Sequence, residues 1–407
     1  MSEGLDSGAH RLHSGAPWWL LHNALSEQSV PLRDPVDVAV IGAGVTGALI
    51  ADAMSAAGAR VALFDRRPPV TGSSAVSTGL LQYELDVPLH RLIDSIGEEN
   101  AVRAYRLSWD AIDRVEQIAR SLERDVGFER KPSLYIASRR RDRKELDQEC
   151  EVRTRHGFET ERWSGAEADE RYGIPCHGAL HTPQAAMIDP VAFSVGLLAR
   201  ALGRGAALLP RTTVSDLRRN GTGYVLVTDR GEVAASQVVF ALGYEMPPKV
   251  LTDTVKLHST FAIVTEPSED LGRWNGRCLV WETARPYAYM RPVGSGRVIC
   301  GGEDLPFKNP DARDALLAPR ARRLETRLST LLPESQLQTA FSWSGTFAET
   351  RDGLPLIGPS AELHGAFVAL GYGGNGITFS VIAADMLCDL LQGRGGTTPF
   401  RLFDPAR

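Results

Sequence analysis

The chain has 407 residues, of which 43% are hydrophobic and 23% are charged, and its formal net charge is -5 at pH 7. This length predicts two domains, or one domain with a large insertion, and the composition is that of a globular protein. The small negative charge provides no basic surface for nucleic acid and no polybasic patch for a membrane, so we expect neither partner.

The N-terminal part contains one short apolar run, PWWLLHNAL. It has no basic leader and no small-residue cleavage site, and it is too short to span a bilayer. We interpret residues 1–34 as a packing segment and expect no integral membrane segment.

The first glycine-rich run, IGAGVTG (Ile41 to Gly47), has the context of a dinucleotide-binding turn. A predicted strand, DVAVI, precedes it, a helical pattern follows in ALIADAMSAA, and a second predicted strand, RVALF, ends at Asp65. We expect Gly42 to allow the tight turn, Gly44 to let the backbone approach a pyrophosphate, and Gly47 to let helix and strand pack closely. The helix N-terminus then faces the phosphates, and Asp65 accepts a hydrogen bond from a ribose hydroxyl.

The middle of the chain alternates between helical and extended patterns. A helix-rich block, ENAVRAYRLSWDAIDRVEQIARSLERDVG, comes first, and hairpin strands with the turn signals NGTG and DRG follow between Val214 and Gly243. Next come HSTFAIVTEP, PYAYMRPV and RVICGGED, which predict antiparallel strands.

The five cysteines are scattered along this sequence at Cys150, Cys176, Cys278, Cys300 and Cys388, and none belongs to a C-x-x-C pair. Zinc, an iron–sulfur cluster and a disulfide framework are therefore disfavoured. We expect no metal site, and reduced thiols in a cytoplasmic protein.

A second run, GYGGNGI, begins at Gly371 and also matches G-x-G-x-x-G. A predicted strand precedes it and a helix follows, but no second strand with a terminal acid comes at the right distance. It is therefore not a second dinucleotide unit, and a plain strand-to-helix turn is the alternative. Four glycines exceed what one turn needs, so we expect a flat or bulky group, such as a flavin ring, to approach this helix N-terminus.

These motifs, in this order, resemble the D-amino-acid oxidase, glycine oxidase and sarcosine oxidase superfamily of flavoenzymes, the DAO family. The matching pieces are VAVIGAGVTG…VALFD, GSSAVSTGLL, MIDPVAF, GAALLPRTTVSDL, VVFALG, RDGLPLIG and GYGGNGI. The resemblance implies an α/β fold with a Rossmann-like FAD-binding domain of the glutathione-reductase type. This domain is interleaved with an α+β substrate domain built on an antiparallel sheet. The implied ranges are 35–90, 170–245 and 340–407 for the FAD-binding domain, and 90–170 and 245–340 for the substrate domain.

The resemblance also implies FAD as the cofactor. The first run then holds the ADP half, the backbone near Val214 contacts adenine, and the second run lies at the flavin. The residues implied at the cofactor are Gly42, Gly44, Val45, Thr46, Gly47, Asp65, Arg66, Ser74, Thr78, Gly79, Leu80, Val214, Ala241, Gly243, Gly371, Gly373, Gly374, Asn375, Gly376 and Ile377. The attachment cysteine and histidine of relatives with covalent flavin correspond to Gly345 and Val76, so we expect non-covalent FAD.

Family members oxidise an amine or amino acid by hydride transfer to flavin N5, giving an imine that water hydrolyses. Here both usual holders of the substrate carboxylate are replaced, since Phe347 stands at the position of an arginine and Asn375 at that of a lysine. Phenylalanine makes no bidentate interaction with a carboxylate. Either another cation takes over, or the small-molecule amine substrate has no α-carboxylate.

Candidate substrate residues lie on TARPYAYMRPV, where alternation places Tyr287, Tyr289 and Arg291 on one strand face. We select Tyr289 and Arg291, together with Phe347 and Gln82 beside the flavin, as catalytic candidates. A packed or exposed strand face is the alternative. Glu84 is a candidate for holding a cationic amine, and a surface acid is its alternative.

Other functions are compatible with the sequence. A 2-hydroxy acid or polyol dehydrogenase on the same fold needs a base near N5, usually histidine, and no histidine lies in a recognisable motif. A non-catalytic flavin-bearing subunit is consistent with the lost carboxylate holders, and an NAD-only dehydrogenase leaves the second run without a role. We expect O2 or a quinone as the electron acceptor. No lysine near GSGRVICGG matches the one that helps oxygen react in sarcosine oxidases, which favours a dehydrogenase.

Overall fold

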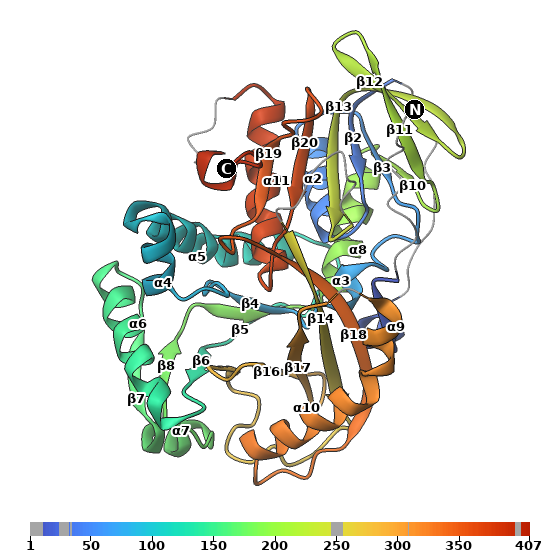
Figure 1. Ribbon diagram of the computed structural model, residues 1–407. Helices are drawn as coiled ribbons and strands as arrows, with labels where there is room; N and C mark the ends of the chain where they lie inside the picture. Colours follow the sequence, from blue (N-terminus) through green and yellow to red (C-terminus); the bar gives the residue numbers. More distant parts are fainter. Residues whose placement is uncertain (1–10, 24–31, 33–34, 246–254, 308, 395–399) are drawn as a thin grey trace.

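The computed structural model describes residues 11–23, 32, 35–245, 255–307, 309–394 and 400–407 (Figure 1). Two large sheets organise these residues, an eight-stranded sheet in the upper half of Figure 1 and a nine-stranded sheet in the lower half. Within the described ranges, no helix is both long enough and apolar enough to cross a membrane.

The eight-stranded sheet has a parallel centre. Its strands are β10 (Ala207–Leu209), β3 (Val61–Phe64), β2 (Val36–Ile41), β13 (Gly231–Gly243) and β20 (Ala366–Leu370), with β12 (Gly223–Thr228), β11 (Val214–Asn220) and β19 (Leu356–Pro359) pairing antiparallel at the edges. The central strands are rich in Val, Ile and Ala and are buried on both faces, as expected for parallel strands covered by helices. The predicted hairpin strands after Val214 are confirmed.

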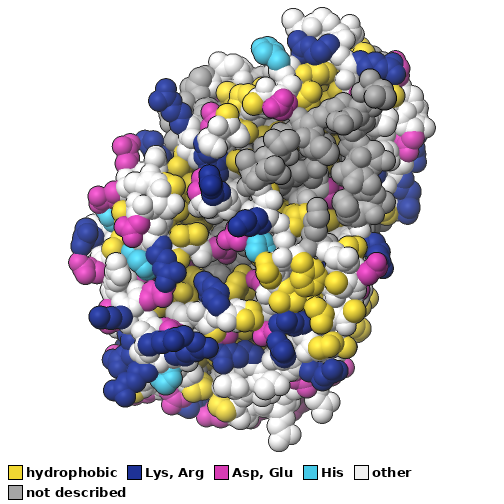
Figure 2. Space-filling view, in the orientation of Figure 1, with side chains coloured by type: hydrophobic (Ala, Val, Ile, Leu, Met, Phe, Trp, Pro, Cys, Tyr) yellow, Lys and Arg dark blue, Asp and Glu magenta, His cyan; other side chains and the backbone are white. Residues whose placement is uncertain are grey.

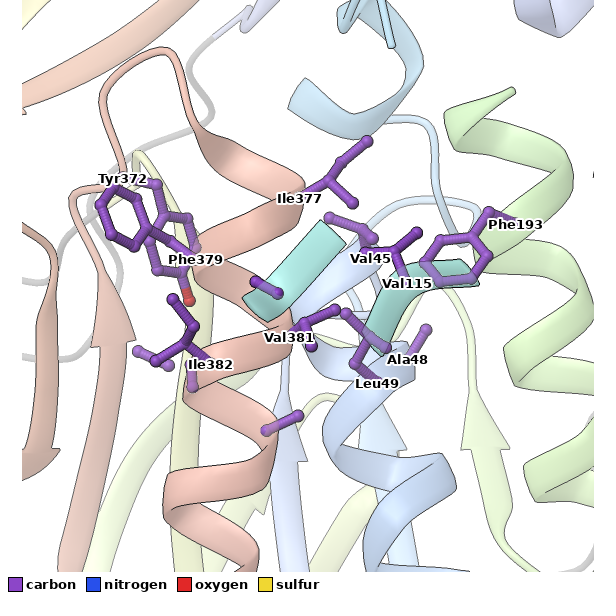
Figure 3. Packing of buried hydrophobic residues seen from close by; sticks show 14 of the residues in the cluster. Val45, Ala48, Leu49, Val115, Phe193, Tyr372, Ile377, Phe379, Val381 and Ile382 are labelled. Carbon is purple, nitrogen blue, oxygen red and sulfur yellow. The ribbon is translucent and has the colours of Figure 1, made fainter. Parts of the chain in front are cut away.

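Four helices pack beside this sheet, and two of them, α2 and α11, begin at the first and the second glycine run. They are α2 (Val45–Ala56), α5 (Glu98–Arg120), α8 (Pro190–Gly203) and α11 (Gly376–Leu391). Figure 3 shows Leu49 of α2 between Val115 of α5 and Val381 of α11, with Phe193 of α8 alongside. Small residues such as Ala48 let α2 approach its neighbours, so the N-termini of α2 and α11 are fixed in the same part of the molecule.

The nine-stranded sheet is mostly antiparallel. Its order is β1 (His13–Gly15), β18 (Thr339–Thr350), β14 (Val255–Thr265), β17 (Arg297–Leu305), β16 (Ala288–Val293), β15 (Leu279–Glu282), β6 (Ser133–Ile136), β8 (Gly178–Thr182) and β7 (Glu161–Ser164). Only the β15–β6 pairing is parallel. The predicted antiparallel strands are confirmed, and α10 (Leu317–Leu331) covers one face with Leu324 and Leu328 in a core shared with Phe261 and Met290.

The remaining elements pack around the two large sheets. They are a small sheet of β4 (Leu80–Gln82), β9 (Ala185–Met187) and β5 (Glu129–Arg130), the short 3-10 helix η1 (Arg140–Asp142), and the helices α1 (Trp18–His22), α3 (Ser73–Val76), α4 (Leu89–Ile96), α6 (Arg143–Arg155), α7 (Gly165–Tyr172), α9 (Pro310–Ala315) and α12 (Phe400–Phe403). Basic and acidic side chains are interspersed over the face shown in Figure 2.

Four strands that fall wholly or almost wholly within the ranges expected for the FAD-binding domain lie outside the eight-stranded sheet. β4 and β9 belong to the small three-stranded sheet, and β8 and β18 belong to the nine-stranded sheet. β8 and β18 fall within 170–245 and 340–407, which we assigned to the FAD-binding domain, yet both pair in the nine-stranded sheet. β18 pairs with β14 along nearly its whole length.

The described part of the N-terminal segment packs against the body of the protein. β1 pairs with β18, and the buried Trp19 donates a hydrogen bond from Nε1 to the Ser77 carbonyl at 2.6 Å. Residues 1–10, 24–31 and 33–34 of this segment lie outside the described residues.

Candidate active site

A first cavity lies at the carboxyl end of β2. Its walls are the turn into α2, the end of β13 and the strand end at Asp65, together with Arg66 and Val214. Gly42 has φ +109°, and a Cβ placed on it would come within 2.3 Å of the Ala241 carbonyl oxygen. A Cβ on Gly47 would come within 1.8 Å of the Gly42 carbonyl oxygen. Only glycine fits at both positions, and their tight packing brings the α2 N-terminus to the cavity wall.

The α2 N-terminus suits an anionic ligand. Its N-cap residue, Gly44, has no capping side chain, and the Val45 N–H donates to Ser74 Oγ at 2.9 Å. The remaining positive end of the helix faces the cavity, which is the arrangement that binds a pyrophosphate.

Charged residues close the far end of the first cavity. The Asp65 carboxylate accepts hydrogen bonds from the backbone N–H groups of Ala43 at 2.9 Å and Arg67 at 2.8 Å. Burial raises the pKa of Asp65, while these two bonds oppose the shift. Behind it, Glu245 accepts hydrogen bonds from Arg66 and, at 2.6 Å, from Arg67. Because each carboxylate oxygen has two lone pairs, Asp65 can still accept a bond from a ribose hydroxyl.

A second cavity adjoins the first. Five residues line both, namely Val45, Thr46, Ser73, Ser74 and Gly243. The two cavities therefore form one elongated site, which runs from Val214 to Tyr289. The rest of the second cavity is lined by Val76, Ser77, Thr78, Pro190, Tyr244, Thr260, Tyr287, Tyr289, Thr346, Phe347, Tyr372, Gly373, Gly374, Gly376 and Ile377. Among the described residues, none that lines this second cavity is charged.

The second glycine run forms one wall of the second cavity and packs on Asp86. The Gly374 N–H donates to Asp86 Oδ2 at 2.7 Å, and a Cβ on Gly373 would come within 2.6 Å of the same oxygen. The Tyr244 hydroxyl donates to the Gly373 carbonyl at 3.2 Å. The backbone of the second run therefore lies directly against a carboxylate, and a Cβ at Gly373 or Gly374 would displace the Asp86 side chain.

These cavities fit FAD. The glycine turn and the helix N-terminus suit the pyrophosphate, and the second run offers bare backbone at the N-terminus of α11. Ser73 Oγ is buried, has no hydrogen-bond partner among the described residues, and lies where the two cavities meet. A buried hydroxyl without a partner is uncommon and marks a place where a ligand atom completes the bonding.

Most of the residues expected at the cofactor line one of the two cavities. They are Gly42, Gly44, Val45, Thr46, Asp65, Arg66, Ser74, Thr78, Val214, Ala241, Gly243, Gly373, Gly374, Gly376 and Ile377. Gly47, Gly79, Leu80, Gly371 and Asn375 do not line either cavity. The Asn375 amide instead donates to the carbonyls of Gln82 at 3.2 Å and Glu84 at 3.0 Å, so it ties the second run to the segment after β4.

The four catalytic candidates divide into two pairs. Tyr289 and Phe347 line the second cavity, whereas Arg291 and Gln82 do not. Gln82 donates its side-chain amide to Ser133 Oγ at 3.0 Å.

Arg291 is buried, and its Nη1 donates to the carbonyls of Thr78 at 3.2 Å and of Gly79 and Ile188 at 2.8 Å. Burial lowers its pKa to about 9. The alternation of strand residues predicted its sheet face correctly. However, its Nη1 group donates to backbone carbonyls beneath the cavity and does not face the cavity itself. The geometry does not fit our expectation that Arg291 holds a substrate.

Glu84 is also committed elsewhere. It pairs with the fully buried Arg153 at 3.3 Å, and Arg153 donates to Glu149 at 2.7 Å. Among the described lining residues of the second cavity there is no histidine. His258 lies beside this wall, where it stacks on Phe347 with ring centroids 5.2 Å apart and pairs with Glu349 at 3.2 Å.

Sequence reasoning missed Asp304, near the end of β17. Burial raises its pKa to about 6, while hydrogen bonds from the side chains of Thr260 and Tyr287 oppose the shift. The strand changes register between Ser259 and Phe261 of β14, opposite Gly302 with φ +129°. This bulge reverses the alternation, so Asp304 faces the side of the cavity, and simple period-two reasoning assigns it to the wrong face.

Comparison with known proteins agrees with this geometry. The family described as FAD dependent oxidoreductase, DAO, matches residues 37–390. Glycine oxidase from Geobacillus kaustophilus (strain HTA426) is 25% identical over 372 residues, which are 88% of this chain and 93% of that protein. Gamma-glutamylputrescine oxidoreductase from Escherichia coli (strain K12) is 22% identical over 371 residues, 88% of this chain and 84% of that protein.

The fold is shared with solved structures as well. The crystal structure of L-proline dehydrogenase from P. horikoshii superposes with a TM-score of 0.79 at 19% identity, covering 92% of this chain and 98% of that one. The predicted α/β fold class with a Rossmann-like FAD-binding part is confirmed. The chain is an enzyme and belongs to the DAO family of FAD-dependent oxidoreductases.

Proposed function

We propose that this enzyme binds FAD non-covalently along the two adjoining cavities and oxidises the C–N bond of a small amine or amino acid. The observation that carries the proposal is the continuity of the site. A turn suited to a pyrophosphate lies at one end, and an uncharged chamber rich in aromatic residues lies at the other. Bound FAD supplies the acceptor for a hydride from the carbon next to nitrogen, which leaves an imine that water hydrolyses.

The residues of the chain itself position the substrate and exclude water from the second cavity. The rings of Tyr287, Tyr289 and Phe347 form the substrate-side wall and exclude water, and the hydroxyls of Thr260 and Thr346 give the wall a few polar points. Holding the substrate carbon close to the acceptor in such a chamber accounts for much of the catalysis, so no acid–base dyad is needed for a neutral amine.

The absence of histidine from the described lining of the second cavity argues against the alternative of alcohol oxidation. A hydroxy acid or polyol needs a base at the reacting oxygen, and this wall offers hydroxyls and apolar rings. The relatives named above include an oxidase of an amino acid and an oxidoreductase of a putrescine derivative, which supports an amine as substrate.

Non-covalent binding is supported by Gly345 and Val76. They occupy the two positions that carry covalent flavin in some relatives, they lie side by side here, and neither has a nucleophilic side chain. We propose O2 or a quinone as electron acceptor. A cytoplasmic location is supported by five free cysteines.

An anaerobic absorbance titration of the FAD-loaded protein tests this function. Primary amines, D- and L-amino acids and 2-hydroxy acids are added in turn while the visible flavin band is followed, with free FAD and the same compounds as control. Bleaching by an amine or an amino acid is expected. Bleaching by hydroxy acids alone would indicate that the enzyme oxidises alcohols and not amines. A flavin that none of the compounds reduces would contradict the proposed activity. Re-oxidation by air or by a soluble quinone then identifies the acceptor.

A further inference from the structure

We propose that Asp304 determines substrate specificity. It binds an ammonium group of the substrate that is separate from the neutral nitrogen undergoing oxidation, in an amine that carries no carboxylate. This inference rests on the proposed function and names the class of substrate. Its basis is a buried carboxylate oxygen without a partner, directly behind the aromatic wall of the second cavity.

Asp304 lies behind two residues of the cavity wall. The side chains of Thr260 and Tyr287, which act on its carboxyl group, both line the second cavity. Its Oδ1 is buried and has no hydrogen-bond partner among the described residues. A buried carboxylate with an unused oxygen is costly unless a donor completes its bonding, so the arrangement points to a ligand that brings one.

The neighbouring charges favour a cation over an anion. Asp86 and Asp304 both act on Tyr287 and raise its pKa, and Asp86 also raises the pKa of Tyr244, in each case after burial. The nearest basic group on this wall is Arg285. It is exposed, lies over the Tyr287 ring at 5.2 Å, and donates to the Ala284 carbonyl at 3.0 Å. Neither Arg285 nor Asp304 is itself a lining residue, but Thr260 and Tyr287, which lie between Asp304 and the cavity, both are.

The shape of the wall supports the same class of ligand. Tyr287 and Tyr289 lie with ring centroids 5.7 Å apart, and Tyr244 and Tyr372 also line the cavity. Aromatic rings beside a carboxylate attract organic ammonium groups through both charge and ring quadrupole. A substrate carboxylate meets no cation among the described lining residues, and Phe347 contributes only an apolar ring.

Two probes that share a tert-butyl group and carry opposite charges test the proposal. tert-Butylamine is an ammonium ion at neutral pH and has no hydrogen on the carbon next to nitrogen, so it cannot be oxidised. Pivalate has the same tert-butyl group and carries a carboxylate. Calorimetric titration of the FAD-loaded protein with each probe, together with the change in the oxidised flavin spectrum, measures binding without turnover. We expect tert-butylamine to bind and pivalate not to bind.

The variant Asp304→Asn keeps the size of the side chain and removes its charge. It should weaken tert-butylamine binding about 10- to 100-fold, because a hydrogen bond to a charged group is lost. The matched control is Glu303→Gln, which neutralises the adjacent carboxylate. Glu303 pairs with Arg320 and Arg323 on α10, on the opposite face of the sheet. This control should bind tert-butylamine within about twofold of the unchanged protein, since the lost charge lies across the sheet.

Three results would overturn the proposal. They are pivalate binding more tightly than tert-butylamine, Asp304→Asn binding the amine as well as the unchanged protein, and Glu303→Gln weakening it equally. If Asp304→Asn does not fold, the two probes on the unchanged protein still decide. Failure of the proposed function is a separate result, because a flavin that no amine reduces leaves the binding of these inert probes to be measured.

Discussion

The two glycine runs have the same spacing of glycines, but they pack against different groups. Each follows a strand of the eight-stranded sheet and enters a helix, α2 at the first run and α11 at the second. In the first, the glycines accommodate other backbone atoms, since Gly42 lies against Ala241 and Gly47 against Gly42. In the second, Gly373 and Gly374 accommodate the carboxylate of Asp86.

The difference shows that the same spacing of glycines serves two purposes. In the first run Gly42 and Gly47 lie against backbone carbonyl oxygens, which cannot turn away, and the neighbouring acids Asp65 and Glu245 both accept hydrogen bonds. The second run borders a chamber where acids lie behind aromatic rings, and one of them, Asp304, has an oxygen without a partner. We therefore expect changes in the first run to damage folding and cofactor binding, and changes in the second to alter ligand recognition while the cofactor stays bound.

The largest effect is expected for Gly47→Ala. The new Cβ would lie 1.8 Å from the Gly42 carbonyl oxygen, so α2 has to move away from the turn. We expect a loss of more than about 3 kcal/mol in the free energy of unfolding and no retained FAD. Thermal melting and the ratio of flavin to protein absorbance measure both. Gly203→Ala is the control, because Gly203 lies in α8 with open space around it and alanine there should be neutral or stabilising. A Gly47→Ala protein that keeps FAD would contradict the account of this turn.

Asp65→Ala tests the acid that the first run has and the second lacks. It removes the acceptor for two backbone N–H groups and, as we propose, for the ribose of FAD, so the dissociation constant of FAD should rise about 10- to 100-fold. Equilibrium titration of the FAD-free protein measures this constant. Glu232→Ala removes an exposed acid on β13 and should leave it unchanged. Equal FAD affinity in the two variants would show that Asp65 does not contact the cofactor.

The buried acid beside the second cavity should make the free energy of unfolding depend on pH, which an apolar core would not do. Burial raises the pKa of Asp304 to about 6 in the folded state, above that of an unfolded aspartate. Asp86, Tyr287 and Arg285 are the ionisable groups that also act on it. The folded protein therefore loses stability as pH rises from about 4 to about 6, and the full cost persists above that range.

Without ligand, Asp304→Asn should be more stable than the unchanged protein by about 1–2 kcal/mol at pH 8, a value reduced for partial exposure of the residue. The advantage should vanish below pH 4. Urea unfolding at both pH values gives the comparison, and Glu303→Gln should show no such gain. A variant that is less stable at pH 8 would indicate that the Asp304 anion is already satisfied within the protein.

The smallest effect is expected for Gly374→Ala. Its Cβ would come within 2.7 Å of Asp86 Oδ1, but a carboxylate can turn away where a backbone carbonyl cannot. We expect a loss of about 1 kcal/mol, retained FAD, and weaker binding of tert-butylamine. Melting and calorimetry measure these changes. Loss of FAD, as in Gly47→Ala, would show that both glycine runs serve the cofactor in the same way.

Features of the fold and site that depend on neighbouring residues were predictable from the sequence. The strand, turn, helix and acid between Asp37 and Asp65 are contiguous, and their pattern determines the cavity wall that they form. The hairpin of β16 and β17 followed from alternation and its turn. Alternation also placed Tyr287, Tyr289 and Arg291 on one face.

Features that depend on distant contacts were not predictable. The face of Arg291 was known, but its partners Thr78 and Ile188 come from other parts of the chain. Asn375 reaches the carbonyls of Gln82 and Glu84. The bulge beside Gly302 turns Asp304 toward the cavity, and no residue pattern on β17 alone reveals it.

The most direct test of this account is a crystal structure of the protein with FAD. We predict the pyrophosphate at Gly42 to Thr46, the adenine beside Val214, and the flavin ring between the second glycine run and Tyr289. A flavin ring at the Val214 end, or an FAD that leaves the second cavity empty, would contradict the assignment of the two glycine runs to the two halves of the cofactor.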